Sequence, residues 1–96
     1  MAGVSDRAVR GVVNGRVQGV GYRWFLCERA RSLGVAGWVR NLRDGAVEFV
    51  ARGDTAAVDR LIAAAREGPA RSSVTSVDTS DPDPVAEFPS PFAILH

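Results

Sequence analysis

The residues that could carry chemistry gather in a glycine-rich stretch of the N-terminal half. Gly15, Gly19 and Gly21 fall within seven residues, between a β-branched segment and a segment with helical spacing. Glycines let successive backbone N–H groups turn toward one point, and the first turn of a helix adds N–H groups that have no intrahelical acceptor. Such a loop suits an anion of phosphate size, so the sequence predicts an anion site over residues 15–22.

Arg23 strengthens this prediction, because it stands where a cation is unfavourable without a ligand. A positive side chain in the first turn of a helix opposes the macrodipole by a few tenths to about 1 kcal/mol. No acidic residue lies within four positions of Arg23, and the nearest is Glu28. A guanidinium that grips a phosphate with two parallel N–H bonds explains the placement. The alternative is a solvated arginine on an exposed turn.

Asn41 is the second candidate, just before the turn-forming pair Asp44-Gly45. An asparagine near a turn commonly hydrogen-bonds its own backbone, and that interpretation stands for the residue alone. In a functional role the amide would hold a water or a substrate oxygen, since it both donates and accepts hydrogen bonds.

The chemistry that is missing narrows the choice further. The chain has one cysteine, Cys27, and one histidine, the terminal His96. These cannot form an intrachain disulfide, a structural zinc site or a Ser-His or Cys-His hydrolytic arrangement. No histidine in the body of the chain is available as a general base, and no Walker A motif is present. We expect Cys27 to be a small core residue.

Composition sets the class of molecule. Ninety-six residues with 46% hydrophobic and 24% charged side chains form one domain over 1–96, with 1–7 as a loose tail. No apolar run can span a bilayer and no secretory signal is evident, so we expect a cytoplasmic protein. Residues 1–52 hold nine arginines against four acidic residues, and 53–96 hold three against seven. The positive half, net +5 against −4, favours an anionic partner there.

Hydrophobic periodicity predicts the elements that position these residues. We expect strands at 9–13, 35–41, 46–52 and 72–80, helices at 22–33 and 54–67, a loop at 81–91 and a short final strand at 92–95. Asp44-Gly45 predicts a two-residue type I′ hairpin turn. Glu48 alternates with its apolar neighbours and is expected on the solvent side. The order βαββαβ predicts an α+β, ferredoxin-like fold: a four-stranded antiparallel sheet with both helices on one face.

Two stretches resemble a known family. Gly15-Arg-Val-Gln-Gly-Val-Gly-Tyr-Arg23 resembles the first signature of the acylphosphatases. Gly37-Trp-Val-Arg-Asn41-Leu-Arg-Asp-Gly45-Ala-Val47, followed by Gly53, resembles the second, and the similarity spans roughly residues 9–95. The resemblance implies a ferredoxin-like fold and hydrolysis of the carboxyl–phosphate bond of acyl phosphates, without metal or cofactor.

The resemblance also implies roles for single residues. Arg23 is expected to bind the phosphate and Asn41 to position the attacking water. The loop is expected to hold the phosphate through the backbone N–H groups of Arg16, Val17, Gln18, Gly19, Val20, Gly21 and Tyr22. We expect a monomer that acts on a small acyl phosphate, with no nucleic-acid or membrane partner.

Two other interpretations stay open at this point. One is a non-catalytic module on the same fold that binds an anion or a nucleic acid, because folds do not fix functions. The other is a domain detached from a larger carbamoyl-transferring or hydrogenase-maturation protein. The start at Met1 and the end at His96 favour a standalone enzyme.

Overall fold

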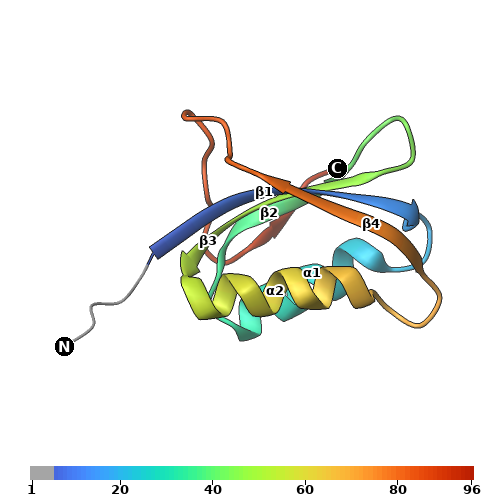
Figure 1. The fold of residues 1–96 in the computed structure, drawn as a ribbon, viewed down its shortest axis with the longest axis horizontal. Coiled ribbons are helices and arrows are strands. Elements are labelled where there is room, and N and C mark those ends of the chain that lie inside the picture. The colour runs from blue at the N-terminus through green and yellow to red at the C-terminus, as the bar shows by residue number, and fades with distance from the viewer. Residues whose placement is uncertain (1–5) are drawn as a thin grey trace.

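The structure, a computed structural model, describes residues 6–96 (Figure 1). The elements follow the predicted βαββαβ order, and the predicted short final strand is present after them. In chain order they are β1 (Asp6–Arg16), α1 (Tyr22–Ser32), β2 (Ala36–Asn41), β3 (Val47–Asp54), α2 (Thr55–Glu67), β4 (Ser73–Ser80) and β5 (Ala93–Ile94). Asp6 and Arg7 open β1, although the sequence predicts them in a tail; the rest of that tail lies outside the described residues.

The sheet has the order β4-β1-β3-β2-β5, with α1 and α2 on one face (Figure 1). The pairs β4–β1, β1–β3 and β3–β2 are antiparallel, which confirms the predicted four-stranded core of the sheet. β5 adds a fifth strand that runs parallel to β2, so the sheet is mixed. The chain returns along the free edge of β2, where the Gly37 N–H donates to Pro89 O at 2.9 Å and the Leu95 N–H to Val39 O at 2.8 Å.

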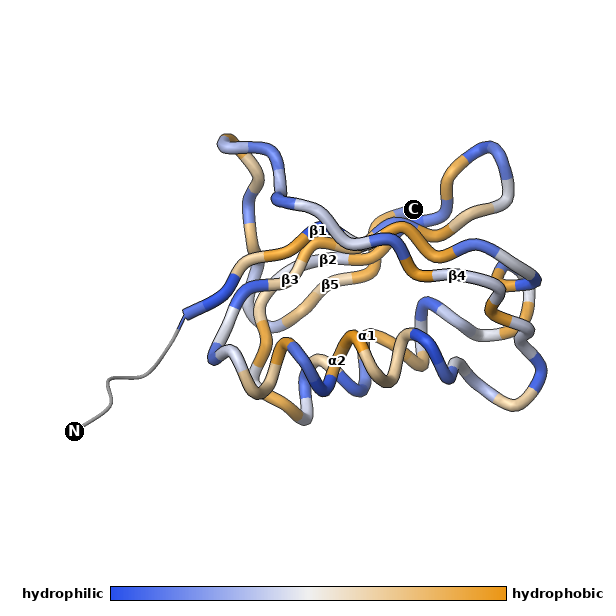
Figure 2. The backbone as a smooth tube through the Cα atoms, viewed as in Figure 1, coloured by the Kyte–Doolittle hydropathy of each residue, from blue (hydrophilic) through white to orange (hydrophobic). Residues whose placement is uncertain are grey.

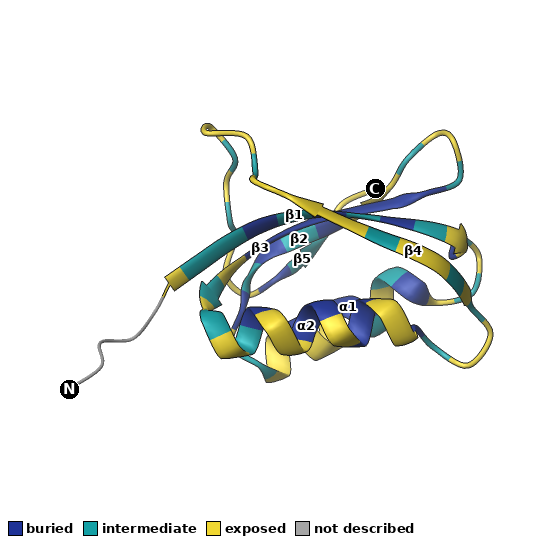
Figure 3. Cartoon of the chain, viewed as in Figure 1, coloured by how far each residue is buried: buried dark blue, intermediate teal, exposed yellow. Residues whose placement is uncertain are grey.

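The core lies between the helices and the sheet, as the tube coloured by hydropathy and the burial colouring show (Figures 2 and 3). On α2 the apolar residues recur at helical spacing and are buried, as the sequence predicts. The largest fully buried side chains are Tyr22, Phe49, Phe92, Leu26, Leu61, Val13, Val17, Val39, Val47 and Val58. Neither helix in residues 6–96 is long and apolar enough to cross a membrane.

The hairpin between β2 and β3 does not use the predicted type I′ turn. Gly45 has φ +96°, but no described residue other than glycine has a positive φ, so Asp44 cannot stand at the centre of such a turn. The Gly45 N–H donates to Leu42 O at 3.3 Å, and the Leu42 N–H to Ala46 O at 2.8 Å. This pattern fits a three-residue loop that ends in a left-handed glycine. The Asp44 carboxylate closes it by accepting from the Ala46 N–H at 3.0 Å.

Glu48 is buried, with 6% of its surface exposed, so the predicted solvent-facing position is wrong. It lies on the central strand β3, on the sheet face opposite the helices, where Arg10 of β1 and Arg40 of β2 flank it. Arg10 Nε donates to Glu48 Oε2 at 2.6 Å and Arg40 Nε to Oε1 at 2.7 Å. Residues from the loop 81–91 line a cavity beside them. Burial alone raises the pKa of Glu48, but the hydrogen bonds and charges of the two arginines outweigh it and lower that pKa.

Residues 92–96 are hydrogen-bonded to α1 and β2. Phe92 is fully buried, and its carbonyl accepts from Arg31 Nε at 2.9 Å and from Cys27 Sγ at 3.4 Å. The Leu95 N–H then bonds to β2. The Leu95 carbonyl accepts from Arg23 Nη1 in the first turn of α1, so the end of the chain reaches the helix start, where the predicted anion site ends.

Candidate active site

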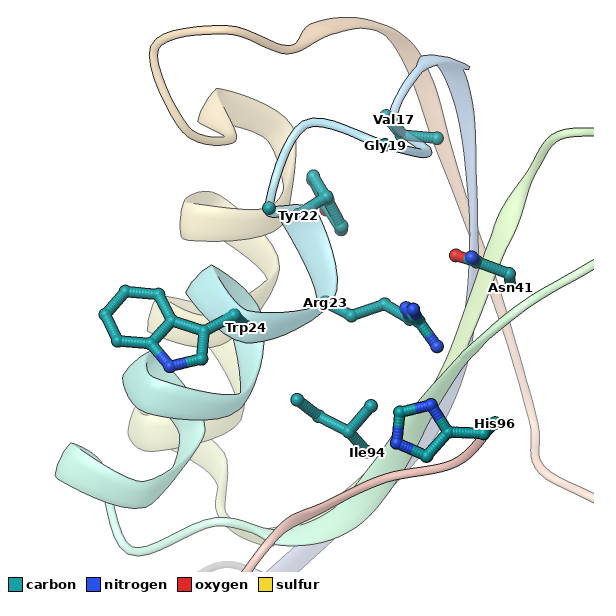
Figure 4. A pocket seen from close by; sticks show the side chains of 9 residues that line it. Val17, Gly19, Tyr22, Arg23, Trp24, Asn41, Ile94 and His96 are labelled. Atoms are coloured by element: carbon teal, nitrogen blue, oxygen red, sulfur yellow. The ribbon is translucent and has the colours of Figure 1, made fainter.

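A pocket of about 190 Å³ lies where the loop after β1, the start of α1, the end of β2 and residues 94–96 meet (Figure 4). Its lining joins segments that are far apart in the sequence. The lining residues are Val17, Gly19, Gly21, Tyr22, Arg23, Trp24, Asn41, Ile94 and His96. The structure thus brings together both predicted catalytic candidates, Arg23 and Asn41, with Val17, Gly19 and Gly21 of the glycine-rich loop.

The loop takes its shape from Gly19 and Gly21. Their φ angles are +73° and +78°, and a Cβ atom would meet nothing within 4 Å at either position. The backbone conformation, not lack of space, therefore requires glycine there. Gly21 is the N-cap of α1 and supplies no capping side chain, and the first turn contains no acidic residue.

The start of α1 faces the pocket with backbone donors. The Phe25 N–H donates to Gly21 O at 3.0 Å, which is the first bond of the helical ladder. The N–H groups of Tyr22, Arg23 and Trp24 precede it and have no acceptor inside the helix. They lie at the positive end of the helix dipole, so this wall of the pocket attracts anions.

The Arg23 guanidinium points into the pocket, and Figure 4 draws it between the Asn41 amide and the His96 imidazole. Its Nη1 donates to the Leu95 carbonyl at 3.2 Å. Within residues 6–96 no carboxylate forms an ion pair with it, although Arg7, Arg10, Arg40 and Arg52 each have one. A half-buried guanidinium is thus held beside unpaired backbone N–H groups without a protein anion.

Asn41 ends β2, opposite Val47 of β3, with its side chain exposed toward the pocket. Its amide makes no hydrogen bond with any group of the described chain, so the turn-capping interpretation does not hold for this residue. Asp44 has that role instead, through its bond to the Ala46 N–H. The Asn41 amide keeps its donor and acceptor for a water or a ligand.

Three of the loop residues predicted to bind phosphate, Arg16, Gln18 and Val20, do not line the pocket. Arg16 is the last residue of β1 and pairs with Ser73 of β4, and Val20 packs against the core. The Gln18 side chain turns to the hairpin, where Nε2 donates to Leu42 O at 2.7 Å and Ala46 O at 2.9 Å. The phosphate loop is thereby tied to the turn that follows Asn41.

Ile94 and His96 are pocket residues that sequence reasoning missed. They lie more than fifty residues beyond Asn41, and no local motif marks them. The one available signal was the predicted final strand, whose edge position beside β2 carries both residues to the site. In the sequence His96 is only a terminal residue, outside the body of the chain, yet the fold places its imidazole beside Arg23 (Figure 4).

Tyr22 and Cys27 have structural partners. The Tyr22 hydroxyl donates to Ala65 O on α2 at 2.8 Å, and burial raises its pKa, so the group stays protonated. Burial also raises the pKa of the Cys27 thiol, which contacts the Phe92 carbonyl rather than the pocket. Cys27 is therefore a buried core residue, as predicted, and a poor nucleophile. Among residues 6–96 no three His, Cys, Asp or Glu side chains gather as a metal site.

Comparison with known proteins identifies the family. The family model for acylphosphatase matches residues 9–94. The acylphosphatase of Methylococcus capsulatus is 47% identical, over 93% of this chain and 96% of its own length. The solved acylphosphatase of Coxiella burnetii superposes with a TM-score of 0.84 at 33% identity, covering 94% of this chain and 93% of its own. That of Bacillus subtilis gives 0.78 at 37% identity, covering 93% and 98%. The chain belongs to the acylphosphatase family.

Proposed function

We propose that this protein hydrolyses the carboxyl–phosphate bond of acyl phosphates, with Arg23 and the loop amides holding the phosphate and Asn41 holding the attacking water. The observation that carries the proposal is the position of Arg23. It lies in a pocket with unpaired backbone N–H groups, and no carboxylate of residues 6–96 neutralises it. Membership of the acylphosphatase family supports the reaction.

The phosphate end of the pocket would stabilise charge where it develops. Phosphoryl transfer requires positioning and stabilisation of the equatorial oxygens more than covalent chemistry. The guanidinium offers two parallel donors, and the amides of the loop and of the first turn of α1 add others in fixed directions. Positive φ at Gly19 and Gly21 gives the loop the curvature to face one anion.

Asn41 would bind the water that attacks phosphorus. Its amide lies in the pocket and makes no hydrogen bond with the described chain, so it can accept from the water or donate to it. The P–O bond to the acyl group breaks as the new P–O bond forms, and the acyl group leaves as a carboxylate. A carboxylate is a weak base, so it departs without needing a proton from the protein.

The proton of the attacking water needs an acceptor. No Asp or Glu lines the pocket, and Asp44 of the nearby turn is engaged with the Ala46 N–H. We therefore propose that a phosphate oxygen of the substrate takes the proton. Tyr22, Arg23 and His96 are the titratable side chains that line the pocket, and the Tyr22 hydroxyl is bonded to Ala65 O. His96 is therefore the side chain to test as an alternative proton acceptor. A rate–pH profile that is unchanged in His96→Gln supports the substrate as base, and loss of one limb in that variant overturns it.

The test is turnover of benzoyl phosphate by the wild-type protein and by Arg23→Ala. The proposal expects hydrolysis by the wild type and a loss of roughly a thousandfold or more in kcat/KM for the variant. Arg71→Ala is the matched control, since Arg71 is exposed and lies away from the pocket, after α2. A chelator should leave the wild-type rate unchanged. Equal turnover by Arg23→Ala and Arg71→Ala contradicts the assignment of Arg23.

The same assay separates the enzyme from a binding module. A non-catalytic anion-binding module would bind inorganic phosphate through Arg23 and release no benzoate. Competition by inorganic phosphate in the wild type, together with benzoate release, therefore supports the enzyme. Phosphate binding without any turnover supports the module.

We also propose that the protein acts as a cytoplasmic monomer without a nucleic-acid partner. RNA-binding sheets of this layout present aromatic rings on their central strands. Phe49 is the aromatic residue of β3, and it is fully buried. The net charge of +1 likewise gives no global attraction to nucleic acid. Light scattering on the purified chain tests the monomer. A shift in the mobility of RNA on addition of the protein would contradict the absence of a nucleic-acid partner.

A further inference from the structure

We propose that the end of the pocket formed by Ile94 and His96 binds the acyl group of the substrate and favours uncharged, flat, apolar acyl groups. This inference rests on the proposed function, because it starts from a phosphate held at the loop end. Once Arg23 and the loop hold the phosphate, the rest of the same pocket lies next to the acyl group. We call this end the acyl end, defined by Ile94 and His96.

The backbone of residues 93–96 fixes which side chains face the pocket. Ala93 and Ile94 pair with Trp38 and Val39 of β2, and the Leu95 N–H donates to Val39 O at 2.8 Å. Successive side chains of an extended chain alternate, so Ile94 and His96 share one side. Both line the pocket, whereas Leu95 lines a separate cavity with Trp38 and Phe88.

The contact that holds Arg23 also fixes the acyl end. Arg23 Nη1 donates to the carbonyl of Leu95, between the two side chains of that end. Figure 4 shows Ile94 and the imidazole on the side of Arg23 away from the loop. The phosphate and acyl ends of the pocket therefore meet at one guanidinium.

The direction of the reaction agrees with this division. The attacking water and the leaving oxygen lie roughly in line on opposite faces of phosphorus. If Asn41 holds the water, the acyl group cannot occupy the Asn41 side. The acyl end is built from another lining segment: Ile94 of β5 and His96, two residues beyond that strand.

The side chains of the acyl end suggest the class of acyl group. Ile94 is half-buried and apolar, and the His96 imidazole beside it is flat and exposed, whereas the Trp24 indole points away from Arg23 (Figure 4). Apolar and flat surfaces gain from covering an apolar, planar group. An acyl group with a second carboxylate would compete with the phosphate for Arg23, the one arginine of the pocket. A positively charged group would find no acidic side chain, because no Asp or Glu lines the pocket.

The test compares benzoyl phosphate with acetyl phosphate, which share the phosphate and differ in the acyl group. We expect the wild type to favour benzoyl phosphate by roughly tenfold or more in kcat/KM, the scale of a few buried methylenes. Ile94→Ala and His96→Ala should lower that ratio severalfold, and the inhibition constant of inorganic phosphate should stay within about twofold. His96 is exposed, so its variant keeps the test open if the Ile94 variant fails to fold.

Val85→Ala is the control, because Val85 is an apolar side chain with 83% exposure in the loop over the opposite sheet face. It should change neither the ratio nor phosphate inhibition. Equal losses for both substrates in Ile94→Ala and His96→Ala, or a wild-type ratio near one, overturn the acyl end and leave the proposed hydrolysis standing. A wild type that hydrolyses neither substrate overturns both proposals.

Discussion

Two groups of arginines lie on opposite sides of the sheet and differ in their charge partners. Arg23 is on α1, on the helix side, and the pair Arg10 and Arg40 is on strands β1 and β2, facing the other side. Arg10 and Arg40 both donate to the buried Glu48, at 2.6 and 2.7 Å. Arg23 donates to a carbonyl and lies beside the helix N–H groups, with no carboxylate paired to it in residues 6–96. We infer that Arg10 and Arg40, on the sheet face opposite the helices, stabilise the fold. We infer that Arg23 instead binds an anion that comes from outside the protein.

Replacing Arg23 by lysine tests whether Arg23 binds an anion, and it has the largest expected effect on activity. The lysine keeps the positive charge but loses the planar fork that matches a phosphate. We expect kcat/KM for benzoyl phosphate to fall roughly a hundredfold, since a point charge cannot restore the paired hydrogen bonds. Arg40→Lys on the far face should leave kcat/KM within about twofold. If Arg23→Lys retains most of the wild-type activity, charge alone suffices and the paired geometry has no catalytic role.

The Asn41→Ala variant has the next largest expected effect, a fall in kcat without loss of phosphate binding. If the amide positions water, we expect kcat to fall about a hundredfold while the inhibition constant of inorganic phosphate moves by less than about threefold. Steady-state kinetics with phosphate as a competitive inhibitor measures both quantities. A variant whose phosphate affinity falls as far as its kcat would show that Asn41 binds the phosphate instead.

Glu48→Gln tests the far face, where the expected loss is stability. Removing one partner from a buried ion pair costs about 3–5 kcal/mol, and half-exposed arginines can recover part of that by hydration. We therefore expect about 2 kcal/mol at neutral pH from denaturant unfolding. Activity of the folded variant should remain near wild type. A loss below about 0.5 kcal/mol would rank this cluster with ordinary surface pairs.

The pH dependence of that loss has a definite sign. The two arginines hold the pKa of Glu48 below its ordinary value in the folded protein. Its contribution is fully present above the unfolded pKa of about 4.3 and disappears as the pH falls through the folded pKa. The stability gap between wild type and Glu48→Gln should thus be constant near pH 7 and shrink below about pH 4. A gap that widens on acidification would reverse the sign of the pKa shift.

These two regions also show where sequence reasoning holds. The glycine loop, Arg23 and the helix start are local in sequence, so spacing alone places them together. The prediction that Glu48 faces solvent is wrong because alternation identifies a face of the strand but not which side chains pack on that face. Arg10 and Arg40, which contact Glu48, and the 81–91 loop, which lines the cavity beside it, approach from three other parts of the chain.

Sequence reasoning missed the residues of the acyl end and predicted the wrong hairpin turn for related reasons. A final strand is predictable from Phe92 to Leu95, but whether it joins the sheet beside β2 is decided by tertiary packing. Only that choice carries Ile94 and His96 to Arg23. At the turn, Asp-Gly fits both a two-residue and a three-residue loop, and the Asp44 bond to Ala46 selects the longer one.

Gln18→Ala gives the smallest expected effect and concerns the link between the loop and Asn41. The Gln18 amide donates to two carbonyls, Leu42 O and Ala46 O, in the turn after Asn41. Without it the loop and the hairpin lose a fixed separation, and we expect kcat to fall about tenfold with protein stability reduced by about 1 kcal/mol.

Two further variants separate positioning from stability. Gln18→Glu directs a carboxylate at the same two carbonyls, so kcat should fall further than in Gln18→Ala. If Gln18 acts by placing Asn41, then Gln18→Ala in an Asn41→Ala background should reduce kcat by less than about twofold. A merely structural Gln18 would give the same tenfold reduction in both backgrounds. Non-additivity in this cycle would therefore show that Gln18 of the first signature and Asn41 of the second act together, although no motif connects their side chains in the sequence.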